Sequence, residues 1–201
     1  MQQYGCARMT VHRAISDLVD KGLILRRKKA GSFVAPPHVQ TAVLEIPDIA
    51  AVIAARRAVY RFDLIDAARC DVGTLAEAVD LADIKGDVLV LDGLHVADGL
   101  PFAFEHRVIS LAAAPEAETA DFSREGPGGW LLGHIPWTQA RHRISARGAG
   151  TKVAARLGIS RDAACLQLER WTWRGPQAVT FVRQWFPGDL YELTADFQPE
   201  G

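Results

Sequence analysis

Residues 7–34 read ARMTVHRAISDLVDKGLILRRKKAGSFV, and this stretch sets the expected fold of the N-terminal part of the chain. Apolar residues recur at helical spacing between Ala7 and Val19, which predicts an amphipathic helix with one buried stripe. Gly22 lies where helices commonly end in a left-handed residue. Two short β-prone segments then flank a basic turn at residues 28–31. This layout is typical of a winged helix-turn-helix DNA-binding domain, although an amphipathic helix with a solvated basic hairpin fits the same pattern.

The distribution of charge favours the DNA-binding interpretation. The chain has a net charge of −1, but residues 1–36 carry seven Lys or Arg and two Asp, a balance of +5, which leaves −6 for the rest. A basic segment on an acidic body indicates that the segment binds a polyanion, so DNA is the expected partner. The candidate DNA-binding residues lie on the first helical turns and on the basic turn: Arg8, Thr10, His12, Arg13, Lys28 and Gly31.

The domain that contains this stretch, residues 1–36, is expected to be partial. A winged helix has two helices before its recognition helix, whereas six residues precede Ala7. We expect either an N-terminally shortened chain or a true start upstream of Met1. Whether such a domain binds DNA stays open, and a ligand-binding module that has lost DNA binding is an alternative.

A second domain is expected over residues 47–201, after an extended linker at 37–46 that follows Pro36-Pro37. Within it the chain repeats one pattern, helix, turn, strand, tight hairpin and return strand, at 74–109 and again at 151–186. Two such units predict an α+β fold with an antiparallel sheet, helices and pseudo-twofold symmetry. Such symmetry favours a cleft near the axis, lined by strands of both halves.

The remaining segments complete the expected domain. Residues 125–129, EGPGG, are predicted to form a loop, a type of segment that often carries mobile binding residues. The other expected elements are a helix at 48–57 capped by Asp48, strands at 59–69 and 138–147, a short helix at 115–122 and a last strand at 191–197.

Several function classes find no support in the sequence. The chain has no Gly-rich phosphate loop, no HExxH or GxSxG motif and no clustered metal ligands, so we expect no catalytic residues, no metal and no cofactor. Three distant cysteines favour a reducing cytoplasm over disulfides. No apolar run approaches the roughly 20 residues that span a bilayer, so no membrane partner is expected.

Polar residues on the predicted inner strands suggest a ligand pocket. Glu105 and Arg107 face the same way on one return strand, and His95 lies on the strand before it. Thr180 occupies a place on the second return strand comparable to that of Glu105. Arg forks match carboxylates, and Glu or His can accept an imidazole N–H. Each residue could equally lie on the solvent face of a half-buried sheet.

The chain resembles the GntR family of bacterial transcription regulators. Arg8–Ala14 followed by Asp20–Leu23 is similar to the family's recognition helix, and Gly31–Val34 is similar to its wing. The C-terminal part resembles the UTRA effector-binding domain, whose fold is like that of chorismate lyase. The motifs that match its histidine-utilisation repressor (HutC-like) subgroup are Leu100-Pro101, Glu105–Val108, Trp130–Leu132, Pro136–Thr138, His142–Ile144, Arg170–Trp173 and Val179–Gln184.

The resemblance implies a homodimeric repressor of histidine-degradation operons that is induced by urocanate, an imidazole with an acrylate tail. It implies operator DNA and a small-molecule effector as partners, and no enzymatic activity. A UTRA regulator of another small anion, such as a sugar phosphate, is the alternative. The effector-binding residues that it implies are His95, Glu105, Thr180 and Phe186 by hairpin alignment, with Arg107, Trp130, His142 and Arg170 added from the subgroup motifs and strand facing.

Overall fold

A computed structural model gives the fold of the chain. It describes residues 24–27, 31–34, 48–76, 81, 83–123 and 125–193. The chain divides into two units, Met1–Ala42 and Val43–Gly201.

The first unit contains the hairpin that the sequence predicts. Strands β1 (Ile24–Arg27) and β2 (Gly31–Val34) pair in antiparallel fashion, with Arg27 opposite Gly31. This arrangement confirms the two β-prone segments on either side of the basic turn. The predicted recognition helix, its candidate residues Arg8, Thr10, His12 and Arg13, the turn residue Lys28 and the linker at 37–46 all lie outside the described residues.

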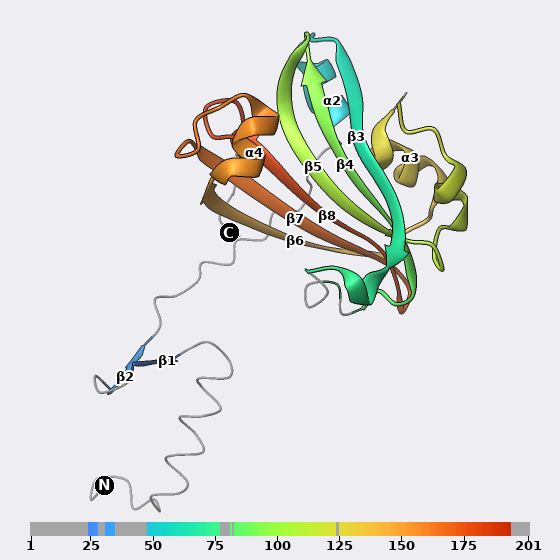
Figure 1. Cartoon of the computed structure of the whole chain (residues 1–201), viewed down its shortest axis with the longest axis horizontal. Helices are drawn as coiled ribbons and strands as arrows, with labels where there is room; N and C mark the ends of the chain where they lie inside the picture. Colours follow the sequence, from blue (N-terminus) through green and yellow to red (C-terminus); the bar gives the residue numbers. More distant parts are fainter. Residues whose placement is uncertain are drawn as a thin grey trace, which may run out of the picture. The chain divides into compact units, whose positions relative to one another are not determined.

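The second unit is built on a six-stranded antiparallel sheet (Figure 1). Its strand order is β3-β4-β5-β8-β7-β6. The strands are β3 (Tyr60–Asp71), β4 (Asp87–Ala97), β5 (Leu100–Ser110), β6 (Gln139–Gly148), β7 (Ala164–Arg174) and β8 (Gln177–Pro187). The helical elements are α2 (Ile49–Ala55), η1 (Val72–Thr74), η2 (Pro115–Thr119), α3 (Gly126–His134) and α4 (Gly150–Leu157).

The strand order confirms the predicted internal repeat. The three strands of each half follow the same path, and the halves meet where β5 pairs with β8. The symmetry corrects one residue assignment. Both central strands span eleven residues, and Thr180 is the fourth residue of β8, so it matches Ala103 of β5 rather than Glu105.

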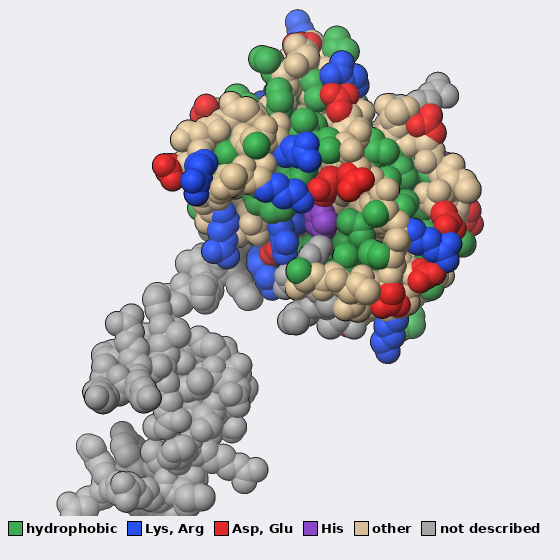
Figure 2. Space-filling view, viewed as in Figure 1, with side chains coloured by type: hydrophobic (Ala, Val, Ile, Leu, Met, Phe, Trp, Pro, Cys, Tyr) green, Lys and Arg blue, Asp and Glu red, His purple; other side chains and the backbone are tan. Residues whose placement is uncertain are grey.

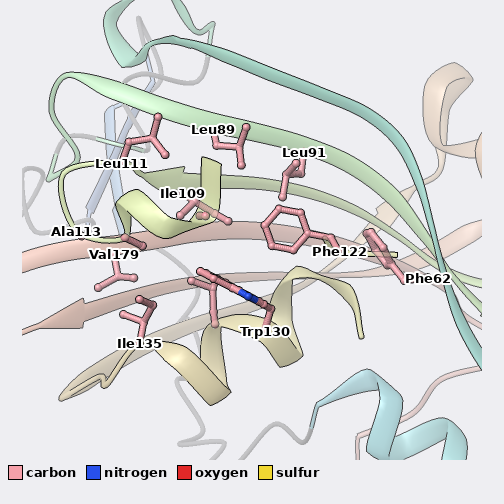
Figure 3. Packing of buried hydrophobic residues seen from close by; sticks show 13 residues of the cluster. Phe62, Leu89, Leu91, Ile109, Leu111, Ala113, Phe122, Trp130, Ile135 and Val179 are labelled. Atoms are coloured by element: carbon pink, nitrogen blue, oxygen red, sulfur yellow. The ribbon is translucent and has the colours of Figure 1, made fainter. Parts of the chain in front are cut away.

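Helices cover the two faces of the sheet unequally. On one face, α2 buries Ile49 and Ile53 against Phe102, Leu168 and Phe186. On the same face, Trp130 of α3 lies against Phe122 and near Leu91 and Ile109 of the strands (Figure 3). The opposite face carries α4, whose Val153, Ala154 and Leu157 pack with Phe104 and Cys165.

Charged side chains cross the α4 face of the sheet in register. Asp92, His106, Arg183, Glu169 and Arg143 occupy successive strands from β4 to β6. His106 bonds Asp92 at 2.6 Å, and Arg183 bonds Glu169 at 2.7 Å. Figure 2 shows this face, with Lys and Arg on one side of a histidine and acidic side chains beside it. The opposite face, under α2 and α3, is the one that encloses a pocket.

Two local predictions were wrong. Residues 126–129 begin helix α3 instead of a loop, because Pro127 suits a first helical turn and Trp130 and Leu131 anchor the helix in the core. The short helix expected at 115–122 is present as the 3₁₀ helix η2 over Pro115–Thr119. A helix was expected at 74–79, but the 3₁₀ helix η1 ends at Thr74 and residues 75–76 are not helical. Residues 77–80 lie outside the described part of the chain.

The last predicted strand, at 191–197, is absent from the part of it that the structure describes. Residues 191–193 have no strand pairing, and the rest of the expected strand lies outside the described residues. The buried Tyr191 instead stacks on Phe186 with ring centroids 4.2 Å apart. The chain after β8 therefore serves as a cover for the core under α2.

Candidate functional site

A pocket opens on the α2 and α3 face of the sheet. It holds about 590 Å³ of space, part of it continuous with solvent. Both central strands contribute to it, which agrees with the predicted cleft near the pseudo-twofold axis. The residues that line it are Asp48, Ile49, His95, Glu105, Arg107, Gly128, Leu131, Leu132, Ile135, Trp137, Arg170, Thr172, Val179, Thr180 and Gln184.

Five of the eight predicted effector-binding residues line this pocket: His95, Glu105, Arg107, Arg170 and Thr180. The strand register explains their convergence. In the pairs His95–Ala103, Glu105–Gln184, Arg170–Val182 and Thr172–Thr180, the two residues lie directly opposite one another on neighbouring strands. Residues that face each other across antiparallel strands share one face of the sheet.

The other three predicted residues do not line the pocket. Trp130 is buried in the core beside Phe122. Phe186 is 1% exposed and packs against Phe102 and Tyr191. His142 lies on the edge strand β6, opposite Arg170. A direct contact of any of the three with a ligand stays a prediction.

A buried hydrogen-bond network forms the floor of the pocket. The Tyr60 hydroxyl lies 3.1 Å from Nδ1 of His95, and Nε2 of His95 lies 3.0 Å from Oε2 of Glu105. Oε1 of Glu105 accepts a 2.6 Å hydrogen bond from Nε of Arg107, and Oε2 accepts one of 2.5 Å from Gln184. These partners place the ring proton of His95 on Nε2, with Nδ1 accepting from Tyr60.

The network keeps Glu105 ionised. Burial opposes the charge, but the Arg107 guanidinium and the bond from His95 outweigh it and hold the pKa of Glu105 far below its usual range. Burial, followed by the charge of Glu105, raises the pKa of Tyr60 well above its usual value. Tyr60 is therefore a hydroxyl donor at every physiological pH, in agreement with its place in the network.

Two arginine side chains, Arg107 and Arg170, line the pocket. Burial and the neighbouring Arg107 both lower the pKa of Arg170, although a guanidinium stays protonated in proteins. Two guanidinium groups that repel each other in a pocket are stabilised by a carboxylate or another anion between them. Burial and Arg170 also lower the pKa of His142 to about 4, so His142 is neutral near pH 7.

The sequence did not single out several pocket residues. Asp48 was assigned to a helix cap, but its side chain makes no cap hydrogen bond and lines the pocket instead. Trp137 is 52% exposed at the pocket. Gln184 lies in a motif that the sequence did mark, so its contact with Glu105 could have been anticipated. Thr172 also lies in a marked motif, Arg170–Trp173, and the strand register places it opposite Thr180. No sequence motif pointed to Tyr60.

The described residues offer no sign of metal chemistry or of membrane insertion. They contain no group of three or more His, Cys, Asp or Glu arranged to hold a metal ion. None of the helices in the described part of the chain is long and apolar enough to cross a bilayer. The lining of the pocket combines charged, hydrogen-bonding and apolar side chains.

Comparison with known proteins gives consistent similarities. Residues 55–192 match the family described as the UTRA domain. The chain is 34% identical to the histidine utilization repressor of Pseudomonas aeruginosa over 205 residues, which cover 98% of this chain and 79% of that protein. The resemblance read from the sequence motifs is thereby confirmed.

Solved structures agree with these matches. The C-terminal domain of the histidine utilization repressor from Pseudomonas syringae pv. tomato is 25% identical, with a TM-score of 0.63, and the match covers 70% of this chain and 100% of that one. PhnF from Mycobacterium smegmatis is 19% identical with a TM-score of 0.67, covering 99% of this chain and 88% of that one, which concerns the fold alone.

Proposed function

The chain belongs to the UTRA-domain family of transcriptional regulators, and on this basis we propose that it is a DNA-binding repressor of histidine-utilisation genes that urocanate releases from its operator. The relatives at 32–34% identity are named as histidine utilization repressors, which agrees with the expectation that this chain is not an enzyme. A repressor acts where its operator lies, so the proposal places the protein in the cytoplasm.

The observation that carries the effector assignment is the chemistry of the pocket. Urocanate is a planar molecule with an imidazole ring at one end and a carboxylate at the other. Arg107 and Arg170 offer guanidinium groups for the carboxylate. Trp137, Leu131 and Leu132 offer apolar surface for a flat ring.

The proposed mechanism couples this pocket to DNA through a homodimer. Arg8 and Thr10 would bind phosphates, His12 and Arg13 would bind phosphates or base edges, and Lys28 and Gly31 would lie along the minor groove. Two copies would place two such sets on a two-fold symmetric operator. Urocanate would favour an arrangement of the two copies that no longer matches the spacing of the operator half-sites.

A sugar phosphate is the second candidate effector, since the arginines of the pocket also suit phosphate. The charge of the lining speaks against it. The positive charges of Arg107 and Arg170 are balanced by the negative charges of Glu105 and Asp48. The pocket therefore accommodates a ligand with one negative charge better than a ligand with two. Neutral imidazole and a single carboxylate meet this condition, whereas a phosphate monoester carries close to two charges at pH 7.

Titration calorimetry distinguishes the candidates. Purified protein is titrated with urocanate and, in a parallel experiment, with glucose 6-phosphate. The proposal predicts saturable binding of urocanate and at least tenfold weaker binding of the sugar phosphate. Tighter binding of the sugar phosphate, or no heat from urocanate, contradicts the effector assignment.

A further inference from the structure

We propose that Asp48 is the residue that selects a ligand with a ring N–H, by accepting the hydrogen bond of that group at the mouth of the pocket. The inference rests on the proposed function, since it takes urocanate as the ligand, and it adds a specificity determinant to the site. No catalytic or cap role accounts for the position of Asp48, because its carboxylate makes no hydrogen bond to the start of α2.

Most hydrogen-bonding positions of the two buried residues suited to an imidazole, Glu105 and His95, are already filled. Oε2 of Glu105 accepts from His95 and Gln184, and Oε1 accepts from Arg107. Both ring nitrogens of His95 are also bound, one to Tyr60 and the other to Glu105. His95 cannot accept a ligand N–H without giving up a buried hydrogen bond, which costs about 1–3 kcal/mol. Glu105 has three of its roughly four acceptor positions filled.

The carboxylate of Asp48 offers hydrogen-bond acceptors that are still available. Among the described residues, its carboxylate forms neither a hydrogen bond nor an ion pair, and the side chain is half-buried in the pocket wall. One of its oxygens would lie 3.7 Å from a methyl group placed on Gly128, and Nη2 of Arg107 would lie 3.3 Å from the same methyl group. Asp48 and Arg107 therefore flank one small gap above α3.

The pocket lining carries charges of both signs. Arg107 and Arg170 attract a carboxylate, while Asp48 repels it and attracts a hydrogen-bond donor. The negative charge of Asp48 acts on the pocket as a whole, because it favours the charged form of Arg170 and disfavours ionisation of Tyr60. A planar ligand that carries both a carboxylate and an N–H group can bind the arginines and Asp48 at once.

The test compares two ligands that differ in the ring donor. Urocanate carries an imidazole N–H, whereas 3-(2-furyl)acrylate has the same acrylate on a five-membered ring without any N–H. Both are titrated calorimetrically into the wild type, into Asp48→Ala and into the control Asp162→Ala, which removes an exposed carboxylate outside the pocket. Binding of the furyl compound reports whether the pocket of each variant is folded.

The inference predicts that wild type and Asp162→Ala prefer urocanate by about tenfold or more, and that Asp48→Ala binds the two ligands within about twofold of each other. A preference that survives in Asp48→Ala overturns the inference, while urocanate binding by the wild type still upholds the proposed effector. Absence of urocanate binding by the wild type overturns the effector assignment and this inference with it.

Discussion

Nε of Arg107 donates a 2.6 Å hydrogen bond to Oε1 of Glu105 inside the protein, where the two side chains are 5% and 1% exposed. The residues are two positions apart on β5 and share one face of the sheet. Glu105 binds Nε of the Arg107 guanidinium, and Nη1 of the same group lies 3.5 Å from the Thr180 hydroxyl. Arg107 is thus both a structural partner of Glu105 and a wall of the pocket.

Arg107→Ala should destabilise the protein by about 3–5 kcal/mol, because it leaves the buried charge of Glu105 without its main partner. Adding Glu105→Gln to this variant should recover part of the loss, since the unpaired charge is then removed. Chemical denaturation followed by circular dichroism measures both. A double variant as unstable as the sum of the two single variants would show that the ion pair is not the source of the effect.

The ion pair of Glu105 and Arg107 should also make the stability of the fold depend on pH. The folded protein holds the pKa of Glu105 below its ordinary value of 4.5, so folding is stabilised above that pH and loses this contribution as the pH falls toward the folded pKa. The wild type should therefore lose stability between about pH 5 and pH 3 more steeply than Glu105→Gln. Denaturant midpoints measured across this range supply the test, and parallel curves would argue against it.

Gly128→Ala should weaken urocanate binding without loss of stability. The new methyl group would lie 3.3 Å from Nη2 of Arg107, inside the pocket, while alanine favours a helix over glycine by roughly 1 kcal/mol. Gly133→Ala on the same helix is the matched control, since its methyl group meets nothing within 4 Å. Calorimetry and thermal melting of both variants check the prediction; equal affinities would exclude α3 from the binding site.

Trp137→Ala should lower the affinity for urocanate roughly tenfold and leave the melting temperature nearly unchanged. The side chain is 52% exposed, so the fold gains little from it, yet it lines the pocket where a flat ring could stack. Val59→Ala, which truncates an exposed side chain outside the pocket, serves as the control. If Trp137→Ala binds urocanate as the wild type does, the ring does not lie against Trp137.

The sequence predicted the architecture well because its signals were local. Alternating strands, the turns at 97–99 and 174–176 and the repeated pattern define the two halves of the sheet. The helical start at residues 126–129 escaped prediction, since three glycines and a proline favour a loop and the packing of Trp130 and Leu131 stabilises the helix. Tertiary packing outweighs local propensity there.

Local sequence signals also predicted part of the site. Glu105 and Arg107 lie two positions apart on one predicted strand, and the period of a strand places them on one face. The position of His95 beside them depends on the strand register. Phe186 could not be separated from the core, because an aromatic residue on an inner strand suits either role. Asp48 was missed because an acidic residue before a helix normally indicates a cap.

The central claim is that the pocket controls DNA binding, and fluorescence anisotropy of a labelled operator from a histidine-degradation operon tests it most directly. Protein is titrated onto the operator at fixed salt, with and without saturating urocanate, since affinity for DNA depends strongly on salt. The account predicts specific binding that urocanate weakens at least tenfold. Operator affinity that is unchanged by urocanate would contradict it.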